Sequence, residues 1–326
     1  MHLGALLLLF TLLAPSLRAE AQPAKKVPRV GLLMPVSSAA AAPNVEAFRQ
    51  ALGEHGWVEG RNIGIEVRYS DGQAERLAEL ATELVRLKVD VIVTWGTPAA
   101  RAAKNVTTSI PIVMAAATDA VATGLIASLA RPGGNVTGVT SGGAELSGKN
   151  LQLLNELVPR VARVAILWNP ENPAQAPMFE QTAAVARALG LQLHSLELRA
   201  PDEFERAFKA MMHQRVGALV VFQELVFFAH RKRIVDLAAQ HRLPAIYERR
   251  EYVDAGGLMS YGVNFRHNFR HAASYVDKIL RGAKPADLAV EQPTRFELVI
   301  NVKTARALRL TIPQSLLLRA DQFVND

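Results

Sequence analysis

Short apolar runs alternate with amphipathic segments along most of the chain. Runs rich in β-branched and aliphatic residues, which are typical of strands, occupy residues 27–35, 62–70, 89–95, 110–116 and 135–140. Segments with helical spacing lie between them at residues 44–57, 73–88, 98–105 and 123–131, the first with Asn44 as its N-cap. Because parallel strands need crossover connections, which are usually helices, this alternation predicts a parallel sheet.

The same alternation starts again after residue 145. Helices are expected at residues 146–159, 176–190, 201–214, 231–242 and 266–282, and strands at residues 161–169, 191–198, 217–223 and 243–248. Two successive α/β units of similar size predict a two-lobed α/β molecule with a parallel sheet in each lobe.

The chain is expected to pass between the lobes at glycine-rich segments. Residues 140–148 separate the two units and are typical of a hinge, and a second passage is expected within residues 254–262. We assign residues 27–140 and 258–285 to the first lobe, and residues 141–257 and 286–326 to the second. The segment 296–310 fits either lobe by its pattern.

The N-terminus predicts export. Residues 3–14 are apolar except Thr11, too short a run to span a bilayer, and Ala19-Glu20-Ala21 matches a cleavage site. We therefore expect residues 1–21 to be a cleavable signal peptide. The chain has no cysteine, which excludes disulfides and a lipid-bearing cysteine. The expected location is the periplasm, as a free protein.

Composition and charge narrow the class of partner. The residues are 50% hydrophobic and 21% charged, which excludes a disordered chain. The formal net charge is +7, but the densest basic groups, residues 231–233 and 249–250, are short. The other basic residues are interspersed with acidic ones, which favours a mixed solvated surface and no nucleic-acid partner.

Several catalytic and cofactor motifs are incomplete. Residues 143–150 match the phosphate-loop spacing, but Asn150 replaces the hydroxyl residue that binds magnesium, and no G-x-G-x-x-G follows the first strand. His267 and His271 are one helical turn apart without a third metal ligand, and no nucleophile elbow is present. We expect no enzyme activity, no cofactor and no metal.

The candidate ligand-binding residues follow expected strands, because ligands of open parallel sheets bind beyond the carboxyl ends of the strands. They are Ser37, Ser38, Trp95, Gly96, Thr97, Thr118, Asp119, Ser141, Trp168, Asn169, Gln223, Glu224, Tyr247 and Tyr261.

Thr97 and Asp119 suggest the chemistry of the ligand. Thr97, followed by Pro98, is expected to cap a helix whose free N–H groups suit a carboxylate. Asp119 ends an apolar strand and needs a partner, either the expected helix 123–131 or a ligand ammonium, which we favour. Trp95, Trp168 and Tyr247 would flank an apolar ligand group or close the core.

Five segments carry a family resemblance that covers nearly the whole mature chain. They are residues 94–140, 149–173, 243–262, 276–308 and 311–321. Together they resemble the substrate-binding proteins of one ABC-transporter family. The resemblance implies the type I periplasmic-binding fold, two Rossmann-like lobes joined by three crossing segments. Some relatives bind aromatic amino acids such as tryptophan or phenylalanine.

The chain departs from the family pattern at three places. Asp119-Ala120-Val121 stands where Asp-Pro-Val is common, Gln223-Glu224 lies near the position of an Asp-Pro, and Leu308-Arg309-Leu310 replaces Leu-Gly-Leu. The second departure bears on the cleft and therefore on the ligand.

The sequence and the resemblance together predict a solute receptor. It would capture an amino acid or a related, possibly aromatic, carboxylate by hinge closure and deliver it to an inner-membrane ABC permease. We expect a monomer. The alternatives are a sensing module that signals to a membrane receptor and a sugar- or nucleoside-binding protein. A transcription regulator would need a DNA-binding headpiece before the first strand.

Overall fold

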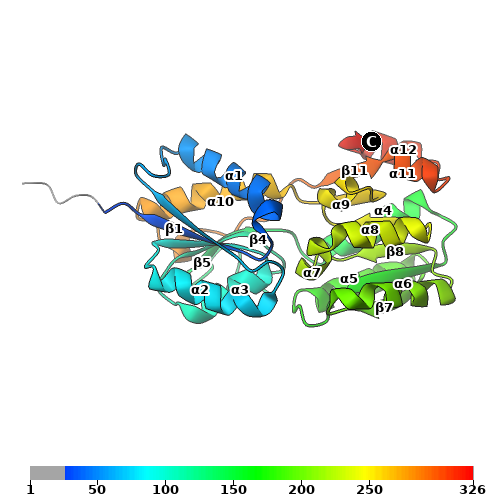
Figure 1. Cartoon of the computed structure of the whole chain (residues 1–326), viewed down its shortest axis with the longest axis horizontal. Coiled ribbons are helices and arrows are strands. Elements are labelled where there is room, and N and C mark those ends of the chain that lie inside the picture. Colours follow the sequence, from blue (N-terminus) through cyan, green and yellow to red (C-terminus); the bar gives the residue numbers. More distant parts are fainter. Residues whose placement is uncertain (1–25, 326) are drawn as a thin grey trace, which may run out of the picture.

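Two separate sheets carry the strands in the computed structural model, which describes residues 26–325 (Figure 1). The first sheet is parallel and defines lobe 1. Its strand order is β2 (Gly64–Tyr69), β1 (Arg29–Met34), β3 (Val91–Trp95), β4 (Ile112–Ala117) and β5 (Val136–Thr140). Helices α1 (Ser38–Glu54) and α10 (Phe265–Leu280) pack together on one face, and α2 (Leu77–Arg86) and α3 (Thr97–Val106) on the other.

The second sheet defines lobe 2. Its strand order is β12 (Gln322–Val324), β11 (Glu297–Asn301), β10 (Met259–Gly262), β9 (Ala245–Tyr247), β8 (Ala218–Val221), β6 (Arg163–Trp168) and β7 (Gln192–Glu197). All neighbours are parallel except β10 and β11. Its helices are α4 (Glu145–Leu157), α5 (Gln175–Ala188), α6 (Phe204–His213), α7 (Leu225–Ala229), α8 (Arg231–Gln240), α9 (Arg250–Asp254), α11 (Val302–Ala307) and α12 (Gln314–Arg319). The prediction of two α/β lobes is confirmed.

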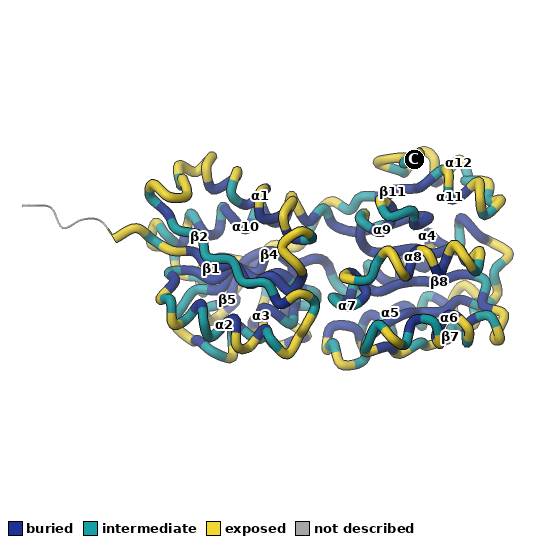
Figure 2. The backbone as a smooth tube through the Cα atoms, in the orientation of Figure 1, coloured by how far each residue is buried: buried dark blue, intermediate teal, exposed yellow. Residues whose placement is uncertain are grey.

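Burial follows the sequence pattern. All residues of β4 and β8 are buried, as expected for central parallel strands covered by helices on both faces (Figure 2). Beside β4, Gly138 lies so close to Met114 that an added Cβ would be 2.3 Å from the Met114 carbonyl oxygen. Gly138 therefore lets β5 pack against β4 where a side chain would clash.

Three segments connect the lobes, and they correct our boundaries. β10 pairs with β9 and β11 in lobe 2, so the chain returns to lobe 1 after Gly262, not at residue 258. Residues 286–291 were assigned to the second lobe. Instead, the Thr137 hydroxyl donates to the Leu288 carbonyl (2.7 Å) and the Thr140 N–H to the Glu291 carbonyl (2.9 Å). Residues 288–291 therefore lie on lobe 1 before the chain enters β11.

Two predicted helices differ in the structure. Residues 123–131 form turns, bends and irregular chain instead of a helix, and side chains of Arg101 and Lys104 of α3 donate to the carbonyls of residues 123–125. The first helix begins at Ser38 rather than after Asn44, which lies buried inside it, and the Ser37 hydroxyl caps it. The short helices α7 and α9 were not predicted.

The predicted signal peptide, residues 1–21, lies outside the described residues. Among residues 26–325, none of the helices combines the length and the hydropathy that a membrane crossing requires.

Candidate functional site

A cleft lies between the lobes at the carboxyl ends of the central strands. We call it the interlobe cleft. It is lined by Trp95, Gly96, Thr97, Pro98, Thr118, Asn172, Ala174, Gln175, Met178, Gln223, Glu224, Leu225 and Arg249. The open space in it is only about 30 Å³, and a ligand pocket typically holds roughly 300 Å³ or more. The lobes therefore meet closely, with room for about one water molecule.

Lobe 1 contributes the start of α3. Gly96, with φ of 83°, is the N-cap, so the prediction that Thr97 caps this helix is wrong. Thr97 is the first helical residue. Its hydroxyl accepts from the Thr118 N–H and donates to the Thr118 carbonyl, both at 3.1 Å. In the first turn of α3 the N–H groups of Thr97 and Ala99 have no intrahelical acceptor, Pro98 has no N–H, and Thr97 lines the cleft.

Trp95 ends β3 and is 2% exposed. Its ring lies 5.5 Å from the rings of both Phe265 and Phe269 of α10, and 6.3 Å from Phe228 of lobe 2. Trp95 therefore belongs to an aromatic cluster that joins the lobes.

Arg249 enters this cluster from lobe 2. The guanidinium carbon lies 3.4 Å from the ring centre of Phe228, 4.5 Å from that of Phe265 and 4.6 Å from that of Trp95. Its Nη2 donates to Glu251 at 2.7 Å. Burial alone would raise the pKa of Glu251, but the charge and hydrogen bond of Arg249 lower it below its usual value. In the sequence Arg249 was noted only as part of a short basic group and was not among the candidate residues; in the structure it is 2% exposed.

Glu224 is the carboxylate of the cleft. It is 7% exposed and accepts hydrogen bonds from Asn172, Gln175 and the Leu225 N–H, each at 2.8 Å. Burial raises its pKa, which these bonds to Asn172 and Leu225 oppose. Within residues 26–325 no cationic side chain forms an ion pair with Glu224. A cationic ligand group would therefore supply the charge that the protein does not. Asn172 and Gln175, which follow strand β6 by a few residues, were not among the sequence-predicted residues.

Glu248 is a second buried carboxyl group at this end of lobe 2. Burial raises its pKa to about 8, although a hydrogen bond from the Gln223 N–H lowers the pKa in part. Its Oε1 has no hydrogen-bond partner. At neutral pH this side chain is therefore mostly protonated and uncharged.

Asp119 lies beside the cleft, at the hinge. It adopts φ of 46°, and its carbonyl accepts from the N–H and hydroxyl of Thr123. A Cβ on Gly143 would lie 2.5 Å from Glu145 Oε2 and 3.0 Å from Asp119 Oδ1. Burial first, and then the charge of Glu145, raise the pKa of Asp119. Two carboxylates from different lobes thus approach the same hinge glycine.

The structure brings together six of the sequence-predicted residues in the cleft. They are Trp95, Gly96, Thr97, Thr118, Gln223 and Glu224. Ser141 lies next to them, because its hydroxyl is 2.9 Å from that of Thr118.

The other predicted residues lie elsewhere. Ser37 and Ser38 are exposed at the start of α1. Trp168 turns into the core, stacks on Phe179 at 5.0 Å and donates to Ser195 at 2.8 Å. Asn169 accepts from the Glu171 N–H in a turn.

The two predicted tyrosines are also outside the cleft. Tyr247 stacks on Tyr252 at 4.5 Å inside lobe 2, and Tyr261 packs on Phe296 at 5.7 Å beside the hinge. Their strand ends are near the cleft, but their side chains point to other surfaces.

Residues 26–325 contain no group of three side chains arranged to hold a metal ion. The rings of His267 and His271 are 6.1 Å apart, and His271 Nε2 lies 3.3 Å from Glu291.

Comparison with known proteins gives the family. Residues 29–324 match the sequence profile of the family described as ABC transporter substrate binding protein. The chain belongs to this family.

Named relatives are similar over most of the chain. A tyrosine-binding protein of Clostridioides difficile (strain R20291) is 26% identical over 284 residues, which cover 87% of this chain and 81% of that protein. The crystal structure of an ABC domain in complex with L-Trp from Streptococcus pneumonia has a TM-score of 0.85 and 26% identity, and covers 91% of this chain and 99% of its own. A conserved domain protein of Vibrio cholerae has the same TM-score and identity, and covers 91% and 100%. The chain is thus a substrate-binding protein with the fold of these relatives.

Proposed function

We propose that this protein captures an α-amino acid, preferably an aromatic one, in the interlobe cleft, as the receptor of an ABC import system. The observation that carries this proposal is the division of charge in the cleft. Within residues 26–325 Glu224 is a buried carboxyl group that forms no ion pair, while the α3 N-terminus and Arg249, which is bonded to Glu251, line the same cleft. A zwitterionic ligand would match this arrangement, with its ammonium at Glu224 and its carboxylate at the α3 N-terminus and Arg249.

Each part of the ligand would have its own partners in the cleft. The ligand carboxylate meets the Thr97 N–H at the start of α3 and the guanidinium of Arg249. The ammonium meets Glu224, with Asp119 at the hinge as the other candidate. Trp95 and Met178 contact the apolar side chain. The similarity to a tyrosine-binding protein and to an L-Trp complex supports this ligand class.

Capture requires the lobes to move. A cleft with about 30 Å³ of open space cannot admit an amino acid, so the lobes open and then close around it. The glycines of residues 142–143, which join β5 to α4, suit such a hinge, and Gly142 has φ of 104°. The closed complex would then be delivered to an inner-membrane permease from the periplasm, with no chemistry on the ligand. The same capture would also serve a sensing module.

A thermal-shift screen tests the proposal. The panel contains amino acids, aromatic carboxylates, sugars and nucleosides, and the protein is residues 22–326. A ligand at 100 times its Kd adds about 2.7 kcal/mol to the free energy of unfolding, so we expect a clear rise in Tm with aromatic amino acids. Stabilisation by sugars or nucleosides alone would contradict the amino-acid assignment.

Two matched variants then test which carboxyl group, Glu224 or Asp119, binds the ligand ammonium. We expect Glu224→Gln to weaken binding at least tenfold, because a charge-assisted bond to the ligand contributes about 1.5–3 kcal/mol. Asp119→Asn is the comparison at the hinge. If only Asp119→Asn weakens binding, the ammonium lies at the hinge and not at Glu224.

A further inference from the structure

A second pocket lies between the lobes, and we call it the α1 pocket. It has a volume of about 310 Å³. Lobe 1 forms one wall with α1 and the start of α10, and lobe 2 forms the other with residues of α7, α8, α9 and β11. It shares no lining residue with the interlobe cleft. The volume is within the range of small-molecule sites.

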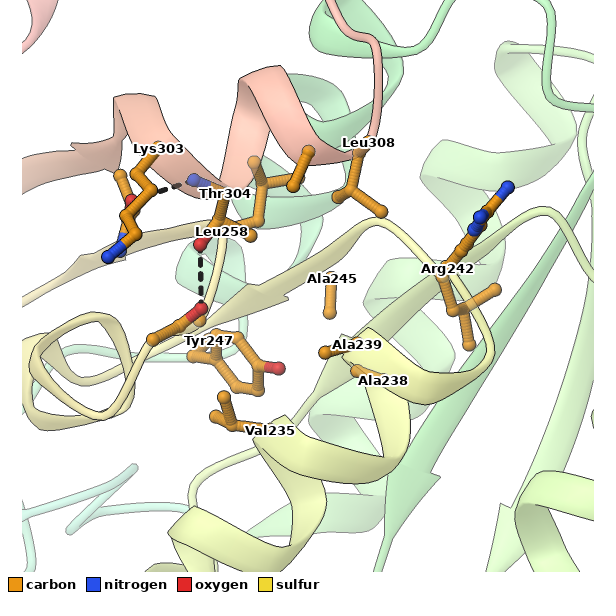
Figure 3. A pocket seen from close by; sticks show the side chains of 15 residues that line it. Val235, Ala238, Ala239, Arg242, Ala245, Tyr247, Leu258, Lys303, Thr304 and Leu308 are labelled. Atoms are coloured by element: carbon orange, nitrogen blue, oxygen red, sulfur yellow. Dashed lines mark hydrogen bonds between the residues drawn. The ribbon is translucent and has the colours of Figure 1, made fainter. Parts of the chain in front are cut away.

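A pocket of about 400 Å³ within lobe 2, between α8, β9 and α11, provides a contrast (Figure 3). Its lining is mostly small or aliphatic, and the hydroxyl of Tyr247 beside it is enclosed by protein. That hydroxyl therefore cannot bond a ligand. The α1 pocket differs, because it has accessible polar groups without partners.

Asn44 is the first of these groups. It lines the α1 pocket from α1 and is 3% exposed. Among residues 26–325 its side-chain amide forms no hydrogen bond, and the amide is not enclosed by protein as the Tyr247 hydroxyl is. A mostly buried amide without a partner is costly, and a ligand in the pocket would satisfy it.

Two arginines at the pocket have no acidic partner. Arg231 of lobe 2 donates to the Phe228 carbonyl at 3.1 Å, and Arg266 of lobe 1 is exposed. Both line the pocket, and within the described part of the chain neither forms an ion pair. The N-terminus of α1 at the same pocket adds a positive partial charge. These groups favour an anionic ligand.

The acidic residues of the lining leave one negative charge. Asp254 pairs with Arg250 at 3.3 Å, and Glu251 pairs with Arg249 at 2.7 Å. Glu297 accepts a hydrogen bond from a neutral amide at 2.9 Å but forms no ion pair among residues 26–325. The pocket therefore has two positive charges and one negative charge that lack partners.

We propose that the α1 pocket is a second ligand site, which binds an acidic amino acid between the lobes. Its two carboxylates meet Arg231 and Arg266, its ammonium meets Glu297, and the Asn44 amide donates to a carboxylate oxygen. L-Aspartate carries these charges and serves as the probe. Succinate lacks the ammonium, and L-asparagine has an amide in place of the second carboxylate.

Calorimetric titration of residues 22–326 with the three compounds tests the site. We expect L-aspartate to bind about fivefold more tightly than either analogue, the effect of one bond of about 1 kcal/mol, because each analogue leaves a charge of the pocket unpaired. Equal affinity for the three compounds would overturn the proposal.

Two variants remove single groups of the pocket. Asn44→Ala and Arg266→Met should each weaken L-aspartate binding about fivefold, again the effect of one bond. Neither change removes a side-chain hydrogen bond or an ion pair within residues 26–325, so both variants should fold normally. Unchanged L-aspartate affinity in both variants would contradict the proposed contacts.

Three further variants separate the α1 pocket from the interlobe cleft. Ala39→Trp places a ring in the pocket from an exposed position of α1, and we expect it to abolish L-aspartate binding. Ala42→Trp, exposed on the same helix but outside the lining, should leave binding unchanged, as should Glu224→Gln in the cleft. L-Aspartate binding that survives Ala39→Trp, or that is lost in Glu224→Gln, would overturn the proposal. Failure of L-tryptophan to bind would instead contradict only the function proposed for the cleft.

Discussion

Lobe 1 borders the interlobe cleft with uncharged groups, whereas lobe 2 borders it with Glu224 and Arg249. Trp95, Thr97 and Thr118 of lobe 1 offer an aromatic ring, a hydroxyl and backbone N–H groups. The charged groups of lobe 2 are held by lobe 2 itself, through Gln175, Asn172 and Glu251.

This difference assigns different tasks to the lobes. Because the polar partners of Glu224 and Arg249 belong to their own lobe, these charges stay in position when the lobes separate. In the proposed mechanism, lobe 2 would thus present a preorganised charged surface to the ligand. Lobe 1 would then cover it with the Trp95 cluster and exclude water, which would strengthen the charged contacts.

The largest expected effect is the loss of Arg249. Arg249→Met removes the contacts of the buried guanidinium with three aromatic rings and its bond to the partly exposed Glu251, so we expect about 2 kcal/mol less free energy of unfolding in urea titrations. Arg250→Met is the matched control, since Arg250 is exposed and pairs with Asp254 on the surface. It should cost less than about 1 kcal/mol. Equal losses in the two variants would remove the distinction between a buried and a surface arginine.

The pH dependence of stability should also come from lobe 2. The pKa of Glu248 rises from 4.5 to about 8 on folding, so between these values the folded protein binds more protons than the unfolded chain. Stability therefore falls as the pH rises, by up to about 1.4 kcal/mol per pH unit. Glu248→Gln should flatten this slope and stabilise the protein more at pH 8 than at pH 5. Parallel pH curves for the two proteins would contradict a buried, protonated Glu248.

The smallest effect is expected in lobe 1. Thr97→Val keeps the shape of the side chain but removes the hydroxyl that bonds the Thr118 backbone twice. We expect about 1 kcal/mol less stability and a weaker effect on ligand affinity than that of Glu224→Gln. Calorimetry on both variants makes the comparison, and a larger affinity loss in Thr97→Val would reverse the roles of the lobes.

The sequence predicted the lobe 1 side of the cleft better than the lobe 2 side. Trp95 ends a strand that leads directly to the cleft, and Thr97 and Thr118 follow such strands, so their position at a strand end was sufficient. Trp168 and Tyr247 also end strands, but which face of the sheet a side chain occupies depends on strand register and packing. Trp168 faces β7 and Phe179, and Tyr247 faces α8.

The burial of charged residues was harder to predict from the sequence. Arg249 stands beside Arg250 in a short basic run that gave no sign of burial, and in the structure aromatic rings of both lobes lie against its guanidinium. Similarly, the helix expected at residues 123–131 has helical spacing, but side chains from α3 satisfy its carbonyls. Periodicity within a segment cannot report partners from distant segments.

The most direct test of the central claim compares an aromatic amino acid with analogues that lack one charge. Calorimetric titration would use L-tryptophan, tryptamine, which lacks the carboxylate, and 3-indolepropionate, which lacks the amine. We predict that L-tryptophan binds and that each analogue binds at least tenfold more weakly, because each leaves one charged group of the cleft unpaired. Binding of either analogue as tight as that of L-tryptophan would contradict recognition of a zwitterion between the lobes.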